Sequence, residues 1–385
     1  GQNNVQGSCD MGAVPGQFPG YQSVEAPDIR AKFETAWGVE KLPDKKGMPI
    51  TEVGHNIEEG KIKAVYLFGE DPFQTEPDLA AVRHAYSQLE LFIAQDIFMT
   101  KSVAEADVVF PATSWGEHEG VYSAADRGFQ RFYKAVEPKG DVKPDWEIHS
   151  LMATAMGYPM KYNNTQEIWD EMRQLCPLYF GATYDKMAGL GYVPWPCLTE
   201  DDPGALWMYK GNRFATPNGK AQLIASEWRP PVDQVDSDFP LILSTVREVG
   251  HYSCRSMTGN CHALATLADE PGFAQMNPID ARELGIRDQQ LIWVEGRRGK
   301  VITRAMLSER INRGAIYMTY QWWIGACNEL TIEHLDPYSK TPEYKYSAVR
   351  VEPIKDQKWA EKYLVEEYDR LKQRLAKAVD EAVAA

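Results

Sequence analysis

The alternation of strand, helix and strand across residues 61–98 constrains the fold of this chain more than any other feature. Residues 61–69 (KIKAVYLFG) and 91–98 (LFIAQDIF) are short apolar runs typical of buried strands. Residues 76–89 between them carry apolar side chains at helical spacing. A third apolar run follows at residues 107–111. Because parallel strands are joined by a crossover that usually contains a helix, this order predicts a parallel α/β sheet.

Polar residues at the carboxyl ends of the first two strands are candidates for ligand binding. Ligands of parallel sheets bind at the carboxyl ends of the strands, where the turn at Gly69 lies. Asp71, Gln95 and Asp96 carry oxygens that can accept the paired N–H groups of a guanine edge. Thr75 can bond to phosphate or ribose. The alternative is that the acids only shape turns or cap helices, which are common roles for Asp.

The second half of the chain has a different texture, with short strands separated by turns that contain glycine. The strands are expected at residues 241–245, 291–295, 300–306 and 315–320, with one short helix at 279–285. Short strands at such spacing predict a β-barrel. A charged helix with one apolar face is expected at residues 358–383. We therefore predict an α/β part at residues 1–206, followed by a barrel domain with a C-terminal helix at residues 207–385.

Residues 245–260 (TVREVGHYSCRSMTGN) are called the donor loop here, because hydrogen-bond donors and cations crowd it after an apolar strand. These side chains are Arg247, His251, Tyr252, Ser253, Arg255, Ser256, Thr258 and Asn260. Gly250 and Gly259 allow the backbone to turn and to approach a ligand closely. Cations, hydroxyls and glycines in this pattern suit a polyanionic ligand, above all phosphate. The alternative is a polar surface loop that binds nothing.

Charge and composition exclude several classes of protein. The net charge of −14 argues against binding nucleic acid, since that requires clustered Lys and Arg. The chain has no apolar run of about 18 residues, so no membrane span is expected, and its polar start is no secretory signal. The six cysteines form no C-x-x-C pair. That indicates reduced thiols in a cytoplasmic compartment, and no iron–sulfur signature in this stretch.

Several motifs in a fixed order carry a resemblance to a known family. They are residues 1–11 (GQNNVQGSCDM), 95–101 (QDIFMTK), 115–130 (WGEHEGVYSAADRGFQ, expected to be irregular), the donor loop, and 319–331 (TYQWWIGACNELT). Together they resemble the C-terminal half of the catalytic (alpha) subunit of molybdopterin-dependent formate dehydrogenases. These are the selenocysteine or cysteine enzymes of the bis-molybdopterin-guanine-dinucleotide superfamily. The resemblance runs to about Arg374 and implies that the barrel is of the double-psi type.

The resemblance implies cofactor-binding roles for residues in both parts of the chain. In the α/β part they are Gly69, Asp71, Thr75, Gln95, Asp96 and Asp145, and one guanine dinucleotide is expected there. In the barrel part they are Arg247, Glu248, His251, Ser253, Tyr320, Asn328, Tyr344 and Lys345, near both pterins. Gln2 is also expected near a pterin. For Asp145 the alternative of simply capping a helix stays open.

The resemblance further implies oxidation of formate to CO2, or the reverse, at a molybdenum or tungsten centre held by bis-molybdopterin guanine dinucleotide. In the family the Cys or selenocysteine metal ligand, the substrate arginine and the 4Fe–4S cluster cysteines all lie upstream of the position of Gly1. No metal ligand is therefore assigned to this chain. The expected partners are the upstream half of the catalytic subunit and a redox partner subunit. The 385 residues alone are expected to be inactive.

No residue of the chain is assigned a catalytic role, and two alternatives concern His251. Its imidazole titrates near neutrality, so it is the best candidate for influencing proton movement near the metal. A hydrogen bond to a pterin or phosphate is the favoured alternative. Two other functions also stay open for the whole chain, namely a non-catalytic molybdopterin-binding module and a related oxyanion reductase. Cytoplasmic, anaerobic metabolism is the expected setting.

Overall fold

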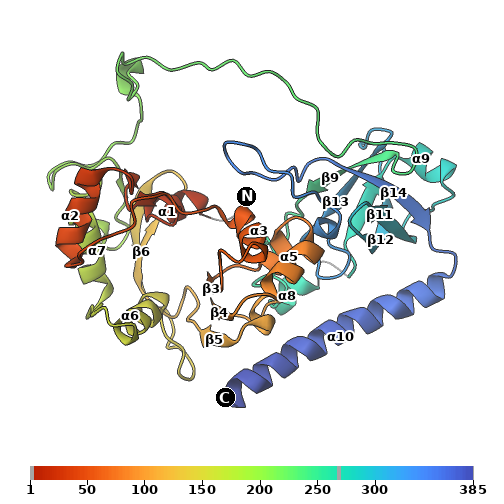
Figure 1. Cartoon of the computed structure of the whole chain (residues 1–385), viewed down its shortest axis with the longest axis horizontal. Coiled ribbons are helices and arrows are strands. Elements are labelled where there is room, and N and C mark those ends of the chain that lie inside the picture. Colours follow the sequence, from red (N-terminus) through yellow and green to blue (C-terminus); the bar gives the residue numbers. More distant parts are fainter. Residues whose placement is uncertain (1–3, 267–269, 385) are drawn as a thin grey trace. The chain divides into compact units, whose positions relative to one another are not determined.

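A computed structural model of the chain describes residues 4–266 and 270–384. The chain packs into two compact units (Figure 1), each built from two separate stretches. The first unit comprises Gly1–Met48 and Ala112–Trp228, and the second comprises Pro49–Pro111 and Arg229–Ala385. The parallel strands therefore pack with the barrel. The predicted division into residues 1–206 and 207–385 stays a prediction about domains.

The first unit combines helices with small antiparallel sheets. Its helices are α1 (Val5–Asp10), α2 (Pro27–Trp37), α6 (Asp145–Ala155) and α7 (Thr165–Leu175), with the short 3-10 helices η3 (Asp185–Met187) and η4 (Lys210–Asn212). Its strands are β1 (Gln17–Phe18), β2 (Gln22–Ser23), β6 (Gly120–Ser123), β7 (Gly128–Phe132) and β8 (Val193–Pro194). The expectation that residues 115–130 are irregular is wrong, because β6 and β7 pair there as an antiparallel hairpin.

A buried carboxylate organises the core of the first unit. Asp10 is fully buried and accepts hydrogen bonds from Tyr21 Oη at 2.8 Å and from Trp195 Nε1 at 2.8 Å. Around it, Phe129 packs edge-on against Trp169 and Tyr179, with ring centroids 4.8 Å apart in both pairs. Burial raises the pKa of Tyr21, and its hydrogen bond to Asp10 adds to that effect. The phenol therefore stays a donor.

The second unit begins with the predicted parallel sheet. Its strands are β3 (Ala64–Phe68), β4 (Leu91–Asp96) and β5 (Val108–Pro111), which pair in parallel in that order. The accompanying helices are η1 (Ile50–Glu52), α3 (Val53–Glu58), α4 (Pro72–Thr75), α5 (Leu79–Tyr86) and η2 (Val103–Glu105). One face of the sheet packs on α3 and α5 through Ile57, Leu67, Tyr86 and Phe92. The predicted strand–helix–strand order is confirmed.

The barrel follows in the same unit. Its strands are β9 (Leu241–Val246), β10 (Phe273–Met276), β11 (Leu291–Gly296), β12 (Lys300–Leu307), β13 (Ala315–Thr319) and β14 (Ser347–Pro353). They close in the order β10-β12-β11-β14-β9-β13. The pairs β10–β12 and β13–β9 are parallel, whereas the other pairs are antiparallel. Fully buried side chains such as Leu243, Ile292 and Met318 fill the interior. The barrel also carries α8 (His262–Ala265), α9 (Pro278–Glu283) and η5 (Cys327–Glu329).

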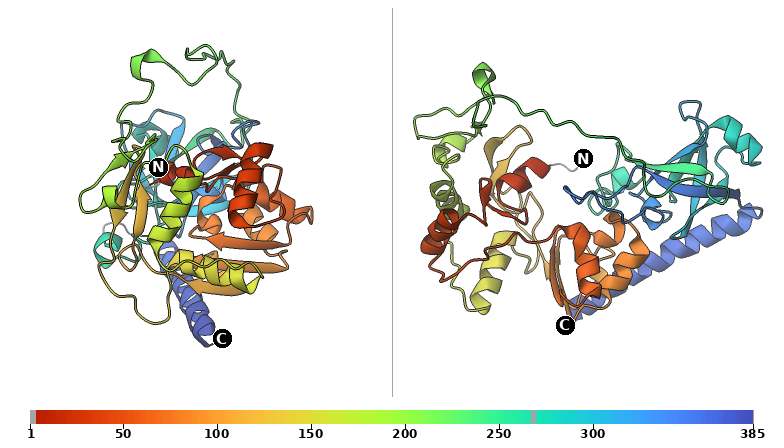
Figure 2. Two further views of the ribbon diagram at one scale, coloured as in Figure 1. Left: turned by 90° about the vertical axis from the view of Figure 1, so that its left-hand side faces the viewer. Right: turned by 45° about the horizontal axis from the view of Figure 1, so that its top comes forward.

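The long C-terminal helix α10 (Gln357–Ala384) completes the second unit. Its first turns dock on the barrel, because Ala360 and Leu364 pack against Leu291 and Ile354. Figure 2 shows its later turns running on toward the sheet, where Arg374 lies 3.8 Å from Glu105 of η2. An α/β part with a parallel sheet, a β-barrel and a C-terminal helix confirm the predicted fold class.

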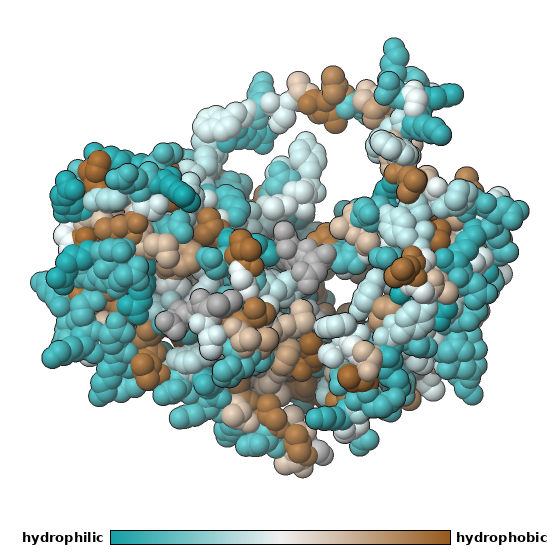
Figure 3. Space-filling model, turned by 180° about the vertical axis from the view of Figure 1, so that it is seen from behind, coloured by the Kyte–Doolittle hydropathy of each residue, from teal (hydrophilic) through white to brown (hydrophobic). Residues whose placement is uncertain are grey.

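One face of the chain is mainly polar. Figure 3 shows hydrophilic residues over most of the face seen from behind, with hydrophobic residues scattered among them. Within the described ranges 4–266 and 270–384, no helix combines the length and apolar character needed to cross a bilayer.

Candidate functional site

The carboxyl ends of β3 and β4, here called the sheet edge, bring together several of the predicted ligand residues. Gly69 adopts a left-handed φ of 64°, which glycine tolerates best, and its N–H donates to Gln95 O at 2.9 Å. Asp71 is only 3% exposed, and its Oδ1 accepts from Ser102 N at 3.0 Å and Ser102 Oγ at 2.6 Å. Burial raises the pKa of Asp71, with Ser102 and Lys101 opposing that shift. One carboxylate oxygen is thus already bound within the protein.

The other predicted residues of this edge also make internal contacts. Tyr66 Oη donates to Gln95 Oε1, and Gln95 is almost fully buried. Asp96 Oδ1 accepts from the backbone N–H groups of Ile97 at 2.6 Å and Phe98 at 3.2 Å, which shapes the turn after β4. These contacts fix where the oxygens of Gln95 and Asp96 lie at the edge of the sheet.

The turn at Thr75 is also held by the barrel. Asn328 Nδ2 and Tyr344 Oη both donate to Thr75 O, at 2.8 Å and 3.2 Å. Lys345 Nζ donates to Thr245 O at 2.5 Å, next to the start of the donor loop. Asn328, Tyr344 and Lys345 were predicted to contact the pterins. The structure places Asn328 and Tyr344 where the sheet edge and the barrel meet within the second unit, and Lys345 against β9 of the barrel.

The donor loop is shaped by Gln321, which the sequence reasoning missed. This residue is fully buried, and its Nε2 donates to His251 O at 2.7 Å and to Glu248 O at 3.3 Å. Its Oε1 accepts from Glu248 N. The loop also holds strained backbone, since Ser253 and Arg255 have φ values of 30° and 62°. Strain of this kind persists only where the surroundings impose it, and it is common in ligand-binding loops.

Polar groups of the donor loop gather around Tyr320. The Arg247 guanidinium lies over the Tyr320 ring, 5.3 Å from its centroid. Ser253 Oγ and Tyr320 Oη are 3.3 Å apart. A cation and two hydroxyls that lie together match the acceptor oxygens of a phosphate or ribose.

His251 supplies the clearest sign of a ligand. Its Nδ1 lies 3.0 Å from Thr258 Oγ1, and its ring packs edge-on against Trp322. Its Nε2 is buried, and none of the residues that the structure describes gives it a hydrogen-bond partner. Burial lowers the pKa of His251 and the nearby Arg255 charge adds to this, so the imidazole is neutral at neutral pH.

The unpaired Nε2 tests whether the residues present fit a pterin dinucleotide. A buried polar atom without a partner costs free energy, and a bound ligand would supply the missing hydrogen bond. In the same part of the fold, the donor set of Arg247, Ser253 and Tyr320 suits the phosphates or the heterocycle of such a molecule. The residues of the donor loop therefore fit the group that the resemblance implies.

Arg255 has a structural role, although it belongs to the donor loop. It is 2% exposed, and its Nη1 donates to Glu270 Oε1 at 2.6 Å. Its guanidinium stacks on Trp322 and Trp323, 4.9 Å and 5.2 Å from the ring centroids. Burial raises the pKa of Glu270, and Arg255 opposes this shift. The charge of Arg255 is thus paired with that of Glu270 inside the protein.

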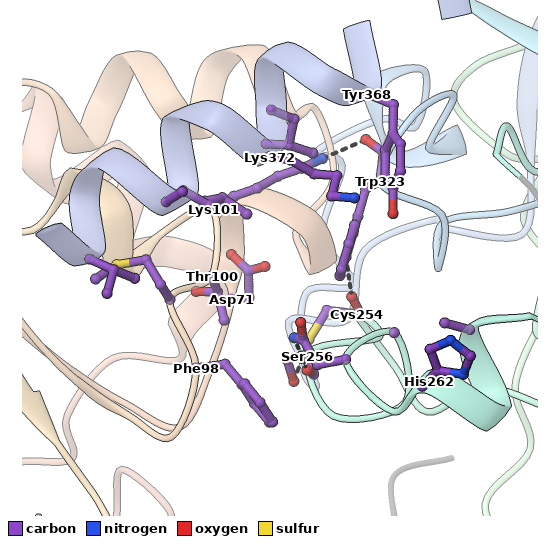
Figure 4. Close-up of a pocket in the computed structure, with 18 residues that line it drawn as sticks. Asp71, Phe98, Thr100, Lys101, Cys254, Ser256, His262, Trp323, Tyr368 and Lys372 are labelled. Atoms are coloured by element: carbon purple, nitrogen blue, oxygen red, sulfur yellow. Dashed lines mark hydrogen bonds between the residues drawn. The ribbon is translucent and has the colours of Figure 1, made fainter. Parts of the chain in front are cut away.

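A cavity of about 560 Å³ lies beside Asp71, between the sheet edge, the donor loop and α10. Figure 4 shows Thr100 and Lys101 on one side, Cys254 and Ser256 on another, and Tyr368 above them. A volume of this size is in the usual range for pockets that hold small molecules.

One predicted ligand residue lies in the first unit, and another is outside the described residues. Asp145 is the first residue of α6 in the first unit, and Pro144 before it is the N-cap. Gln2 lies outside the described residues. Among residues 4–266 and 270–384, no group of three or more His, Cys, Asp or Glu side chains is placed to hold a metal ion.

Comparison with known families places these features in a class. Residues 241–348 match the family "Molydopterin dinucleotide binding domain", which covers the barrel from β9 to the start of β14. Residues 2–155 match the family "Molybdopterin oxidoreductase". The chain therefore belongs to the molybdopterin oxidoreductases and contains a molybdopterin dinucleotide binding domain.

Formate dehydrogenases are among its relatives within this family. The chain is 62% identical to formate dehydrogenase H of Escherichia coli over 98% of its own length and 53% of that protein. It is 39% identical to the F420-dependent formate dehydrogenase 2 subunit alpha of Methanococcus maripaludis, over 92% of this chain and 52% of the relative. The predicted resemblance is confirmed, and the chain spans about half the length of these relatives.

A solved structure shares the fold. Acetylene hydratase from Pelobacter acetylenicus superposes with a TM-score of 0.65 at 18% identity, covering 85% of this chain and 50% of that one. At this level of identity, the match concerns the fold alone.

Proposed function

We propose that this chain is the cofactor-binding part of a formate dehydrogenase catalytic subunit, which oxidises formate to CO2 or runs the reverse reaction. The observation that carries the proposal is the 62% identity to formate dehydrogenase H over 98% of the chain. The Nε2 of His251, buried without a partner among the described residues, supports a dinucleotide ligand in the donor loop, and so does the pairing of Arg247 with Tyr320.

We propose that two groups of residues bind different parts of the cofactor. Gly69, Asp71, Thr75, Gln95 and Asp96 at the sheet edge hold one molybdopterin guanine dinucleotide. The resemblance further implies a guanine contact for Asp145 and a pterin contact for Gln2. Arg247, Glu248, His251, Ser253 and Tyr320, with Asn328, Tyr344 and Lys345, contact the pterins. The carboxylates and amides read the guanine edge, while the cation and hydroxyls bind phosphates.

The bound molybdenum or tungsten cofactor supplies the two-electron redox chemistry. The residues of this chain bind and orient that cofactor. Arg247 offers a permanent positive charge for a phosphate. His251 offers a neutral ring nitrogen, because its lowered pKa disfavours the charged form. A hydrogen bond from His251 to a pterin or phosphate is therefore better supported than a role in proton movement.

In this proposal, the remaining catalytic groups lie outside this chain. The metal ligand, the substrate arginine and the 4Fe–4S cluster lie in the upstream half of the catalytic subunit. A redox partner subunit takes the electrons. The predicted cytoplasmic setting is kept as part of the same proposal.

The test combines composition with activity. A mass spectrum of the intact purified protein, with pterin and metal analysis, is expected to show a guanine-containing pterin together with molybdenum or tungsten when the upstream half is present. The 385 residues alone are expected to show no turnover of formate with a viologen dye. Robust turnover by this chain alone would contradict the proposal.

Two assays separate the proposal from its alternatives. A non-catalytic module would carry the pterin but give no formate turnover even when the upstream half is supplied. A related oxyanion reductase would oxidise reduced viologen with an oxyanion such as nitrate and leave formate untouched. Formate turnover that depends on both halves supports the proposal over either alternative.

A further inference from the structure

We infer that Gln74 and Lys101 are positioning residues that hold the donor loop in its ligand-binding conformation. The inference deepens the proposed function and rests on it, because it names what keeps the proposed cofactor loop in place. Neither residue belongs to the predicted ligand set. Both come from the turns at the carboxyl ends of β3 and β4.

Gln74 lies in α4 and is fully buried. Its Nε2 donates to Trp322 O at 2.8 Å and also to Tyr320 O. Its Oε1 accepts from Lys101 Nζ at 2.6 Å. Both ends of one amide are therefore engaged, and the two barrel carbonyls are held against the turn after β3.

Lys101 adds a second connection to the same segment of the barrel. Its Nζ also donates to Trp323 O at 2.7 Å, as Figure 4 shows. The carbonyls of Tyr320, Trp322 and Trp323 are thus all bound by this pair of side chains. They belong to one short segment that directly follows β13.

That segment in turn holds the donor loop. Gln321 binds the backbone of His251, and the ring of Trp322 packs against the His251 imidazole. Trp323 Nε1 donates to Cys254 O at 3.1 Å. Each residue from Tyr320 to Trp323 therefore contacts the donor loop with its side chain. Displacing their backbone would move the loop and the unpaired nitrogen of His251 with it.

The partial burial of Lys101 makes this arrangement sensitive to substitution. Burial lowers the pKa of Lys101, and Asp71 is the largest of the negative charges that oppose this effect. Removing the ammonium group would leave Gln74 Oε1 and Trp323 O without these bonds in a partly buried setting. Losing a hydrogen bond to a charged partner changes an equilibrium by roughly a factor of ten or more.

The experiment compares Lys101→Met with Lys372→Met in the full catalytic subunit carrying its cofactor. Lys372 lines the same cavity but is exposed, and its Nζ lies 5.1 Å from the centroid of the Tyr368 ring. Retained pterin dinucleotide is measured over time after dilution, and amide hydrogen exchange is measured in the donor loop and in β11. The Lys101 variant is expected to lose dinucleotide about tenfold faster, with a similar increase in donor-loop exchange. The Lys372 variant is expected to match the wild type.

Amide hydrogen exchange in β11 distinguishes a positioning role from a general effect on stability. If the role of Lys101 were purely structural, exchange would rise as much in β11 as in the donor loop. If Lys101→Met does not fold, Gln74→Glu is the second variant. It keeps an acceptor for Lys101 but loses the donor to Tyr320 and Trp322, so the same loop-specific change is expected.

Unchanged loop exchange and retention in a folded variant would overturn the inference. If the wild-type protein retains no pterin, the proposed function fails on its own. The hydrogen exchange of the donor loop still decides whether Gln74 and Lys101 hold it.

Discussion

The sheet edge and the donor loop both carry residues predicted to bind the cofactor. Their polar groups differ in whether they have hydrogen-bond partners within the protein. At the sheet edge, the carboxylate of Asp71 is bound by Ser102, and Thr75 O is bound by Asn328 and Tyr344. In the donor loop, His251 Nε2 is buried without a partner among the residues that the structure describes.

A polar residue in a predicted site can therefore stabilise the fold, bind the ligand or do both. Internally bound groups at the sheet edge stabilise the protein whether or not a ligand is present. An unpaired buried group adds no such stability and costs free energy until a ligand binds. Substitutions at the sheet edge should therefore change stability without cofactor, while those at His251 should change cofactor binding.

The largest expected effect is that of Asp71→Ala. Truncation leaves the buried N–H and hydroxyl of Ser102 without their acceptor. The free energy of unfolding of the cofactor-free chain is expected to fall by about 2–4 kcal/mol. Urea unfolding followed by tryptophan fluorescence measures this change.

Asp71→Asn is the matched control for that variant. The amide oxygen can still accept from Ser102, and removing the charge offsets part of the cost of burying it. We expect the unfolding free energy to stay within about 1 kcal/mol of the wild type. Dinucleotide retention should nevertheless fall if the carboxylate reads guanine N–H groups. Equal destabilisation by both substitutions would show that charge, and not the bond to Ser102, holds this turn.

Glu76, directly after the same turn, is expected to give the next largest effect. Burial, together with the charges of Glu70 and Glu333, raises the pKa of Glu76 from 4.5 to about 7. The folded chain therefore binds this proton more tightly than the unfolded chain. Its stabilising contribution is fully present below about pH 4.5 and is lost as the pH rises through about 7.

Glu76→Gln removes this pH dependence. At about pH 8 the variant is expected to be more stable than the wild type by about 1–3 kcal/mol. At about pH 4.5 the difference should vanish, because both forms are then neutral. Unfolding free energies measured across this pH range test the expectation. A constant difference at all pH values would mean that the substitution acts by another route.

The elements that were predicted well are those whose apolar pattern is local. The expected strand at residues 91–98 corresponds to β4 (Leu91–Asp96), and the expected helix at 358–383 to α10 (Gln357–Ala384). Strands β10 and β14 were missed. β10 is only four residues long, and β14 has the sequence SAVRVEP, in which Ser, Arg and Glu interrupt the apolar run. Both are fixed by pairing with strands that are distant in the sequence.

The candidate site was predictable only where a residue type suggests its own chemistry. His251 and Arg247 were found because cations, hydroxyls and glycines crowd one loop. Gln321, Gln74 and Lys101 act by binding backbone carbonyls and amides, and no local pattern shows which carbonyl a side chain will meet. Lys101 and Trp323 are 222 residues apart in the chain, so their contact exists only in the folded protein.

His251→Asn is expected to have the smallest effect on stability. It also tests the difference between the sheet edge and the donor loop most directly. The shorter amide can replace Nδ1 in the contact with Thr258 but places nothing at the position of Nε2. Because Nε2 has no partner among the described residues, the cofactor-free chain should change by less than about 1 kcal/mol. Dinucleotide affinity should fall about tenfold, since a hydrogen bond to the ligand is lost. His251→Gln, whose amide reaches closer to the position of Nε2, should retain more affinity. A pH optimum of formate turnover that shifts while occupancy stays constant would instead assign His251 to proton movement.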